Sequence, residues 1–129
     1  MELNLVVFDI DGTLVDSEAL ILEGFAQTLS ELGYPVPAPE AVLSLIGLSL
    51  PEVMARLMPK ADSATRERAI KAHRARFFAL RSNRGPASVA LFDGARETIE
   101  ALAARPEILI GAATGMPRRG LDHVLEVHN

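Results

Sequence analysis

The sequence of 129 residues predicts an α/β fold, with strands near the two ends of the chain and helices between them. Residues 3–8 and 108–113 are short apolar runs, and they lack the polar alternation of a half-exposed strand. Both are therefore predicted to be buried strands. The intervening segments carry helix caps and apolar residues at helical spacing, and glycine-containing polar turns follow each strand.

A first helix is predicted from about Ser17 to Leu32, with Asp16 or Ser17 as its N-cap and Gly33 as its C-terminal stop. Its large apolar residues recur on one stripe, which indicates one buried face. These residues are Leu22, Phe25, Leu29 and Leu32.

Helices are also predicted through the middle of the chain. A short one covers about 40–46, and the sequence Ser-Leu-Pro-Glu at 49–52 is typical of a capping box that opens a helix to about Met58. A longer helix covers about 63–81, and residues 82–88 are predicted to be a linker. A turn at 91–94, a helix to about Arg105, and a final helix from Pro117 flank the second strand.

Composition excludes several classes of protein. The chain has no cysteine, which excludes a disulfide framework, a thiolate metal site and a cysteine nucleophile. The net charge of −4 gives no basis for a nucleic-acid partner. There is no signal-peptide pattern and no apolar segment of membrane-spanning length, so we expect a cytoplasmic protein without a membrane partner.

The strongest chemical signal is the pair of carboxylates that follows the first strand. Asp9 and Asp11 are two residues apart, so an extended chain directs both to the same side. Two close carboxylates repel each other unless a cation or a proton lies between them, and oxygen ligands suit Mg²⁺. The alternative interpretation is that Asp9 and Asp11 are ordinary turn residues, since aspartate is common in turns. An EF-hand is excluded because Gly12 comes too early and no glutamate follows at the required spacing.

The stretch Phe-Asp-Ile-Asp-Gly-Thr-Leu-Val-Asp-Ser-Glu at 8–18 resembles the first motif of the haloacid dehalogenase superfamily, in its phosphoglycolate phosphatase-like branch. The resemblance implies a Rossmann-like core of parallel strands with flanking helices and an inserted α-helical cap. It places the core at 1–15 and 86–129 and the cap at 16–85. The core would be incomplete, with only its N-terminal part visible.

The resemblance also implies the chemistry: a Mg²⁺-dependent phosphomonoester hydrolase acting on a small phosphorylated metabolite. Asp9 would be the nucleophile and a metal ligand. Asp11 would protonate the leaving alkoxide, deprotonate the attacking water and bind the metal through its backbone carbonyl. An aspartyl-phosphate divides one difficult displacement into two easier ones.

Thr114 and Gly115, at the end of the second strand, resemble the second motif of the family, and together with Gly12 they would bind the phosphate. A helix N-terminus also suits an anion on general grounds. An ordinary strand-to-helix turn is the alternative. Many relatives have a lysine after this glycine, whereas here Met116 follows. We expect Arg118 and Arg119 to be surface charges.

The loop with Gly47 and Leu48 resembles the cap loop that contacts the rest of the substrate, although Gly47 also suits a plain helix–helix turn. The loop has no lysine for a Schiff base, which favours simple phosphomonoester hydrolysis. The three histidines, His73, His123 and His128, fit no ligand pattern and are expected at the surface.

Two later motifs of the family have no candidate in this sequence. The two lysines, Lys60 and Lys71, lie in the predicted cap, and no acidic pair follows a third strand. We therefore expect impaired activity. The alternative is a truncated or degenerate, non-catalytic chain that pairs with another chain through an exposed sheet edge. A receiver-type phospho-acceptor fits less well, because it lacks a helical insertion after the first strand.

Overall fold

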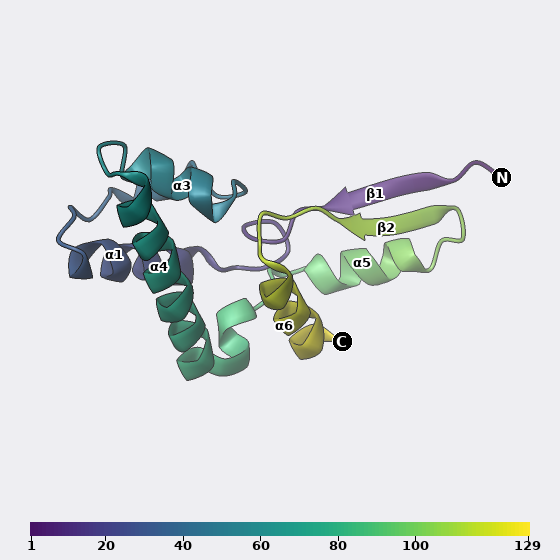
Figure 1. The fold of residues 1–129 in the computed structure, drawn as a ribbon. Helices are drawn as coiled ribbons and strands as arrows, with labels where there is room; N and C mark the ends of the chain where they lie inside the picture. The colour runs from purple at the N-terminus through teal and green to yellow at the C-terminus, as the bar shows by residue number, and fades with distance from the viewer.

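A computed structural model describes residues 1–129 of the chain, without gaps. Helices α1 to α4 gather in one part of the molecule, and the two strands project from the other part, beside α5 and α6 (Figure 1). The elements in order are β1 (Asn4–Phe8), α1 (Glu18–Glu31), α2 (Pro39–Leu43), α3 (Leu50–Leu57), α4 (Ser63–Arg84), the 3-10 helix η1 (Gly85–Val89), α5 (Ala95–Ala103), β2 (Ile108–Ala112) and α6 (Arg118–His128).

Strands β1 and β2 form a two-stranded parallel sheet, in which Asn4 pairs with Ile108 and Phe8 with Ala112. Beyond the last pair, the amide of Ala113 donates to the carbonyl of Phe8 at 2.9 Å. Because the strands are parallel, their carboxyl ends lie at the same edge of the sheet. The residues that follow each strand are therefore brought together, as the predicted fold requires.

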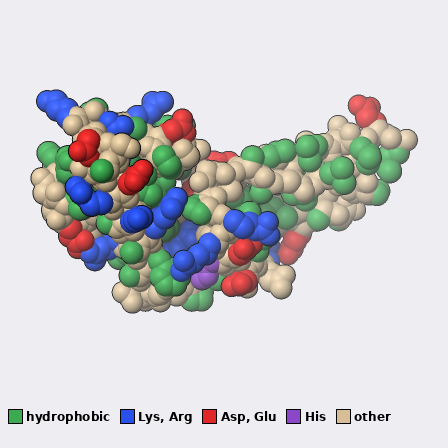
Figure 2. Space-filling view, viewed as in Figure 1, with side chains coloured by type: hydrophobic (Ala, Val, Ile, Leu, Met, Phe, Trp, Pro, Cys, Tyr) green, Lys and Arg blue, Asp and Glu red, His purple; other side chains and the backbone are tan.

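The prediction that both strands are buried is wrong for this chain. Leu5 is 65% exposed, Val7 51% and Leu109 54%. These side chains share one face of the sheet because their positions alternate with the pleat. Helix α5 packs against β2, but no element covers this face (Figure 1). Figure 2 shows hydrophobic side chains along the projecting strands.

Helices α1 to α4 enclose the larger hydrophobic core. The predicted apolar stripe of α1 contributes Phe25 and Leu29, which are buried, whereas Leu32 at its end is exposed. Helix α4 packs against both α1 and α3. The buried members of this core are Ile21, Phe25, Leu29, Val42, Leu45, Val53, Met54, Met58, Ala61 and Ala69. No helix of the molecule combines the length and apolar character needed to span a membrane.

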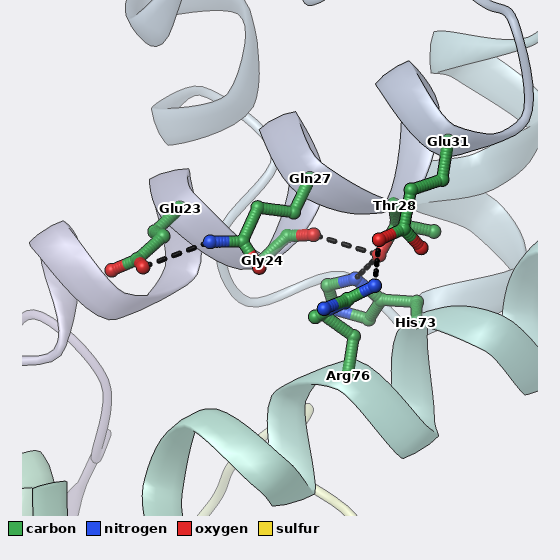
Figure 3. A network of polar contacts seen from close by, with 7 residues as sticks. All are labelled: Glu23, Gly24, Gln27, Thr28, Glu31, His73 and Arg76. Carbon is green, nitrogen blue, oxygen red and sulfur yellow. Dashed lines mark hydrogen bonds and ion pairs between the residues drawn. The ribbon is translucent and has the colours of Figure 1, made fainter. Parts of the chain in front are cut away.

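Contrary to the expectation of a surface residue, His73 of α4 is buried in this core. Its ring stacks on Phe25 with centroids 4.1 Å apart. Its Nδ1 lies 3.4 Å from the hydroxyl of Thr28, which itself donates to the carbonyl of Gly24 at 2.7 Å (Figure 3). A Cβ on Gly24 would stand 3.1 Å from the ring of Phe77, so this glycine lets α1 and α4 approach closely.

A second, smaller core lies beneath the strand ends and consists of Ile10, Val15, Val89 and Val124. His128 is half-buried here, with Nε2 in contact with the carbonyl of Val89. His123 is half-buried too, and its Nε2 is buried without a partner. Both histidines therefore depart from the expected surface position, because α6 turns one face onto this core.

The chain passes between the two cores twice, and the two crossings lie side by side. The amide of Asp16 donates to the carbonyl of Ala90 at 2.8 Å, and that of Phe92 donates to the carbonyl of Leu14 at 2.9 Å. Val15, between them, is fully buried. The crossings thus form a short hydrogen-bonded connection rather than two free linkers.

The predicted linker at 82–88 is wrong. Helix α4 continues to Arg84, and Gly85–Val89 forms the 3-10 helix η1. The hydroxyl of Ser88 donates to the carbonyl of Gly85 at 2.7 Å, which supports the turn. By contrast, the predicted capping box of α3 is confirmed, since Ser49 and Glu52 bond to each other across the first turn.

Candidate active site

A cavity of about 1180 Å³ lies between the helical part and the carboxyl ends of the strands. Six of the seven residues that the sequence singles out line it: Asp9, Asp11, Gly47, Leu48, Thr114 and Gly115. They come from three separate segments of the chain. The fold therefore brings together carboxylates, a helix N-terminus and a loop of the helical part.

Asp9 follows β1 directly and is exposed to the cavity. Its Oδ1 accepts a hydrogen bond from the amide of Ile10 at 2.8 Å, while its Oδ2 lies 3.4 Å from the hydroxyl of Thr13. Buried Ile10 anchors the chain immediately after Asp9. One carboxylate oxygen is thus fixed by the backbone, and the other has only a long contact and is available to a ligand.

Asp11 is held differently. Its Oδ1 accepts a hydrogen bond from the hydroxyl of Ser17 at 2.7 Å. Ser17 is buried and precedes α1, where the sequence predicts an N-cap, but its side chain makes no capping bond to that helix. The hydroxyl instead orients the second carboxylate. Only the folded turn could reveal this use of Ser17.

Gly12 does not line the cavity. Its φ of +79° favours glycine, and its amide donates to the carbonyl of Val15 at 2.9 Å. The structure therefore places Gly12 in the turn that carries Asp9 and Asp11, with its own N–H engaged inside that turn.

Thr114 and Gly115 connect β2 to α6. The hydroxyl of Thr114 accepts from the amide of Met116 at 3.0 Å. The N-terminus of α6 follows, where the amide of Gly120 already donates to the carbonyl of Pro117 at 2.8 Å. The amides of Arg118 and Arg119 have no helical partner and lie at the positive end of the helix dipole. This end of the cavity can bind an anion.

Gly115 touches the helical part of the molecule. A Cβ at this position would stand 2.8 Å from the carbonyl oxygen of Gly47 and 2.9 Å from that of Leu48. The two predicted segments are thus in direct backbone contact, which closes one side of the cavity. Any larger residue at 115 would push the loop with Gly47 away.

Arg81, near the end of α4, is a lining residue that the sequence reasoning missed. It is 8% exposed, and its guanidinium lies 4.9 Å from the ring centroid of Phe77. Burial lowers the pKa of Arg81, and the negative charge of Asp11 opposes this effect. Arg81 follows Phe77 by four residues, so both lie on the same face of the predicted helix. This spacing is the signal by which the sequence could have identified Arg81 as a lining residue.

The expectation that Arg118 and Arg119 are exposed is confirmed. Arg118 pairs with Asp122 at 2.7 Å, and the guanidinium of Arg119 lies 4.0 Å from the ring centroid of Phe78. Both also line the cavity. Lys and Arg side chains gather where α4 faces α6 (Figure 2), and Asp122 and Glu126 of α6 line the cavity there too, so this wall carries charges of both signs.

The carboxylates provide part of a metal site. No group of three or more His, Cys, Asp or Glu residues gathers closely enough to enclose an ion. Mg²⁺, however, usually keeps several waters and is bound by one or two carboxylates together with substrate phosphates. The oxygen donors of Asp9 and Asp11 fit that pattern.

The family model for haloacid dehalogenase-like hydrolases matches residues 6–129. Over 91 residues the chain is 41% identical to the tyrosine-protein kinase PtkA of Mycobacterium tuberculosis, a match that covers 70% of this chain and 29% of that protein. It is 39% identical over 57 residues to a putative pyrophosphatase PpaX of Caldanaerobacter subterraneus, covering 43% of this chain and 26% of that protein.

Solved structures agree with this match. The structure of Mycobacterium tuberculosis PtkA has a TM-score of 0.75 and 31% identity, over 99% of this chain and 56% of that one. A predicted phosphatase from Clostridium acetobutylicum shares the fold with a TM-score of 0.81 and 24% identity, over 100% of this chain and 57% of that one. The chain thus spans a little more than half of these structures. By the family match along almost its whole length, the chain belongs to the haloacid dehalogenase-like hydrolases.

Proposed function

We propose that this chain carries the nucleophile, the proton donor and the phosphate-binding turn of a Mg²⁺-dependent phosphomonoester hydrolase of the phosphoglycolate phosphatase-like type. The observation that carries the proposal is the position of Asp9 and Asp11 at one cavity with Thr114 and the N-terminus of α6. Nucleophile, acid and anion-binding groups are the parts that phosphoryl transfer to a carboxylate needs.

In the first step, the Oδ2 atom of Asp9 attacks phosphorus, because Oδ1 is engaged by the amide of Ile10. The bond between phosphorus and the ester oxygen breaks, and Asp11 donates a proton to the departing alkoxide. In the second step, Asp11 accepts a proton from water, which attacks the aspartyl-phosphate and releases inorganic phosphate. Ser17 keeps the Asp11 carboxylate in place for both transfers through its hydrogen bond of 2.7 Å.

Asp9 and Asp11 would hold Mg²⁺, Asp11 through its backbone carbonyl. The ion would offset the repulsion between the Asp9 carboxylate and the phosphate dianion. Thr114, Gly115 and the first turn of α6 would bind the phosphoryl oxygens, and Gly12 would support them by shaping the turn. No other step depends on the ion.

The two hydrophobic cores suggest how the chain divides into a catalytic part and a substrate-binding part. We propose that residues 1–15 and 86–129 form the catalytic core and that 16–85 form a cap, which bounds the substrate cavity with Gly47 and Leu48. The separate hydrophobic clusters and the paired crossings at Val15 and Leu91 support this division. The substrate would be a small phosphorylated metabolite, held between cap and core.

The test is hydrolysis of p-nitrophenyl phosphate with Mg²⁺ by the wild-type chain and by Asp9→Asn, Asp11→Asn and Asp93→Asn. Asp93 is an exposed turn residue outside the main cavity and serves as the control. Asp9→Asn removes the nucleophile, so it should abolish both turnover and the phosphate labelling of the protein that an aspartyl-phosphate would give. Asp11→Asn should slow turnover by about 10²- to 10⁴-fold. Equal rates for wild type and Asp9→Asn would refute the assignment of Asp9.

The identity of 41% with a protein named as a tyrosine kinase supports a second candidate, transfer of a phosphoryl group to tyrosine. The two candidates differ in their donor. A phosphatase releases phosphate from a simple ester without nucleotide, whereas a kinase labels a tyrosine peptide only with ATP. Parallel assays with ATP plus a tyrosine peptide, and with p-nitrophenyl phosphate alone, separate them.

The third candidate is a non-catalytic chain that pairs with a second copy through the open sheet. The exposed face of β1 and β2 supports it. It predicts association without Asp9-dependent turnover, so the same assays combined with a measurement of mass in solution distinguish it from both enzymes.

A further inference from the structure

Helix α4 carries most of the positive charge of the chain. Seven of the thirteen Lys and Arg residues lie within its 22 residues, and Glu67 is its only acid. The rest of the chain has the opposite balance, with six cations and sixteen acids. Lys and Arg side chains are accordingly numerous over the helical part (Figure 2). So uneven a distribution makes α4 the one strongly basic element of an acidic chain.

Four of these seven cations have a place in the folded molecule. Arg76 and Arg84 each pair with a glutamate of α1. Arg66 donates to two carbonyls of the segment that joins α3 to α4, and Arg81 is buried. The remaining three are exposed and form no ion pair: Arg68, Lys71 and Arg74.

These three cations follow one another along the outer side of the helix, because they recur every three residues. The inner side of α4 packs on α1 and α3. Like charges at this spacing destabilise a helix, and Glu67, four residues before Lys71, offsets only part of the repulsion. The folded chain by itself therefore leaves an excess of positive charge between Arg68 and Arg74.

The same side of α4 continues into an apolar patch. Phe78 is 54% exposed, and the guanidinium of Arg119 covers one face of its ring at 4.0 Å from the centroid. Ala75 and Ala79 beside it are exposed and small, so another segment can approach the helix closely here. We call residues 68, 71, 74, 75, 78 and 79 the outer face of α4. Its cations and its aromatic ring lie within about 15 Å along the helix.

We propose that the outer face of α4 binds an acidic segment of a partner protein, with an apolar side chain of that segment on Phe78. The argument is charge complementarity. Carboxylates spaced by three or four residues, as on one side of a helix, match the spacing of Arg68, Lys71 and Arg74. Such a segment removes the repulsion among the three cations, and its apolar residue covers the exposed ring. This inference goes beyond the phosphoryl-transfer function and does not rest on it.

Nucleic acid fits this surface less well. The basic stripe is only one helix wide, it contains the acidic side chain of Glu67, and the chain as a whole has a net charge of −4. A phosphate backbone is uniformly negative and is repelled by such acids, whereas a polypeptide can place its carboxylates selectively. The surface therefore favours an acidic polypeptide.

The test measures binding of a defined probe by the full chain. A fluorescein-labelled peptide carries glutamate at every third or fourth position and one leucine, and a second peptide has glutamine in place of each glutamate. Fluorescence anisotropy gives both affinities at low and at physiological salt. We expect the acidic peptide to bind at least about tenfold more tightly, and the difference should shrink as salt rises. Equal affinities, or no binding of either peptide, would overturn the proposal.

Lys71→Glu reverses the central charge of the outer face at a position outside the cavity, so it should lower the affinity for the acidic peptide about tenfold. Lys71→Arg should retain the affinity. The matched control is Lys60→Glu, at an exposed cation before α4 that also forms no ion pair. It changes the net charge by the same amount. Equal losses in Lys71→Glu and Lys60→Glu would reveal only long-range attraction and would overturn the proposal.

Phe78→Ala tests the apolar part of the surface. It should weaken binding of the acidic peptide that carries leucine and leave unchanged the affinity of an acidic peptide with alanine at that position, because only leucine loses a contact. An equal effect on the two peptides would contradict the placement of the apolar side chain on Phe78.

Thermal unfolding separates binding from a folding defect. Lys71→Glu should melt at or above the temperature of the wild-type chain, because it relieves repulsion from Arg68 and Arg74. Lys71→Gln removes the charge without reversing it and should lose part of the affinity at an unchanged melting temperature. Loss of binding confined to variants that melt lower would overturn the proposal. So would a single-stranded DNA oligonucleotide that binds more tightly than the acidic peptide and depends on Lys71.

Discussion

Asp9 and Asp11 leave the same strand end but have different environments. The carboxylate of Asp9 is exposed with one oxygen bonded to the next amide, whereas that of Asp11 is half-buried and bonded to a buried hydroxyl. An exposed oxygen suits attack on phosphorus, and a firmly oriented carboxyl suits proton transfer. The two proposed roles therefore follow from two side-chain environments, although both residues are aspartates.

Gly115 is required for contact between the two parts of the molecule. In Gly115→Ala the new Cβ would meet the carbonyl oxygens of Gly47 and Leu48 at 2.8 and 2.9 Å. These are backbone atoms and cannot rotate away, so the loop must move. We expect the free energy of unfolding to fall by about 1–3 kcal/mol, measured by urea denaturation, and the affinity for inorganic phosphate to fall with it.

Gly111→Ala is the matched control. A Cβ at Gly111, in β2, would lie 3.8 Å from Leu5 Cδ1 and 3.9 Å from Val7 Cγ2, which is ordinary contact. This variant should be neutral or slightly stabilising. Equal destabilisation by the two substitutions would show that the contact with the loop is not what constrains Gly115.

At the scale of elements, α1 and α4 hold the helical part together. Their contact includes the ion pair of Arg76 with Glu31 at the surface (Figure 3) and the stacked rings of His73 and Phe25 inside. Because α4 also carries Arg81, its packing against α1 sets where that cation meets the cavity. The helix pair thus connects the stability of this part to the geometry of the proposed site.

The pH dependence of stability should report on this contact. Burial lowers the pKa of His73 from 6.5 to about 4, although a hydrogen bond with Gly24 opposes the shift. Between these values the unfolded chain binds a proton that the folded chain does not. The contribution of His73 to the free energy of unfolding is therefore fully present above about pH 6.5. As the pH falls toward 4, this free energy decreases by about 3 kcal/mol in total.

Urea denaturation at several pH values between 4.5 and 7 measures this effect, and His73→Leu should flatten the dependence. The control is Val42→Ala in the same core, which should lower stability by a similar amount at every pH, because it removes packing without removing a titratable group. An unchanged pH dependence in His73→Leu would contradict the assignment to His73.

At the scale of the molecule, the open sheet predicts self-association. Leu3, Leu5, Val7 and Leu109 are all more than half exposed, and the outer edge of β1 has no neighbouring strand. Such a surface favours pairing with a second copy. Sedimentation velocity should show a mass that rises with concentration.

A double substitution, Leu5→Lys with Val7→Lys, places two charges on that face and should shift the chain toward the monomer. Val36→Lys replaces an exposed apolar residue outside every helix and strand and is the control, with no change in mass expected. A wild-type chain that stays monomeric at high concentration would argue against pairing through the sheet.

Most elements could be predicted because their signals are local. The capping box of α3, the apolar stripe of α1 and the turn with Asp9 and Asp11 depend on residues close together in the sequence. Each forms, except that Leu32 at the end of the α1 stripe is exposed. The linker at 82–88 failed because α4 continues to Arg84 and is stabilised by contacts with distant helices, which no local pattern contains.

Motif spacing and apolar periodicity lie along the chain, so they were enough to predict the family, the order of strands and helices, and six of the seven singled-out residues that line the cavity. Tertiary structure alone decided the burial of His73, the hydrogen bond of Ser17 with Asp11 and the unpaired cation of Arg81. The burial of His73 and the contact of Arg81 with α6 join residues on different elements, and the hydrogen bond of Ser17 with Asp11 needs the folded turn between β1 and α1. The tertiary structure also decided that the apolar strands stay exposed, since burial depends on what packs against a strand rather than on the strand's own residues.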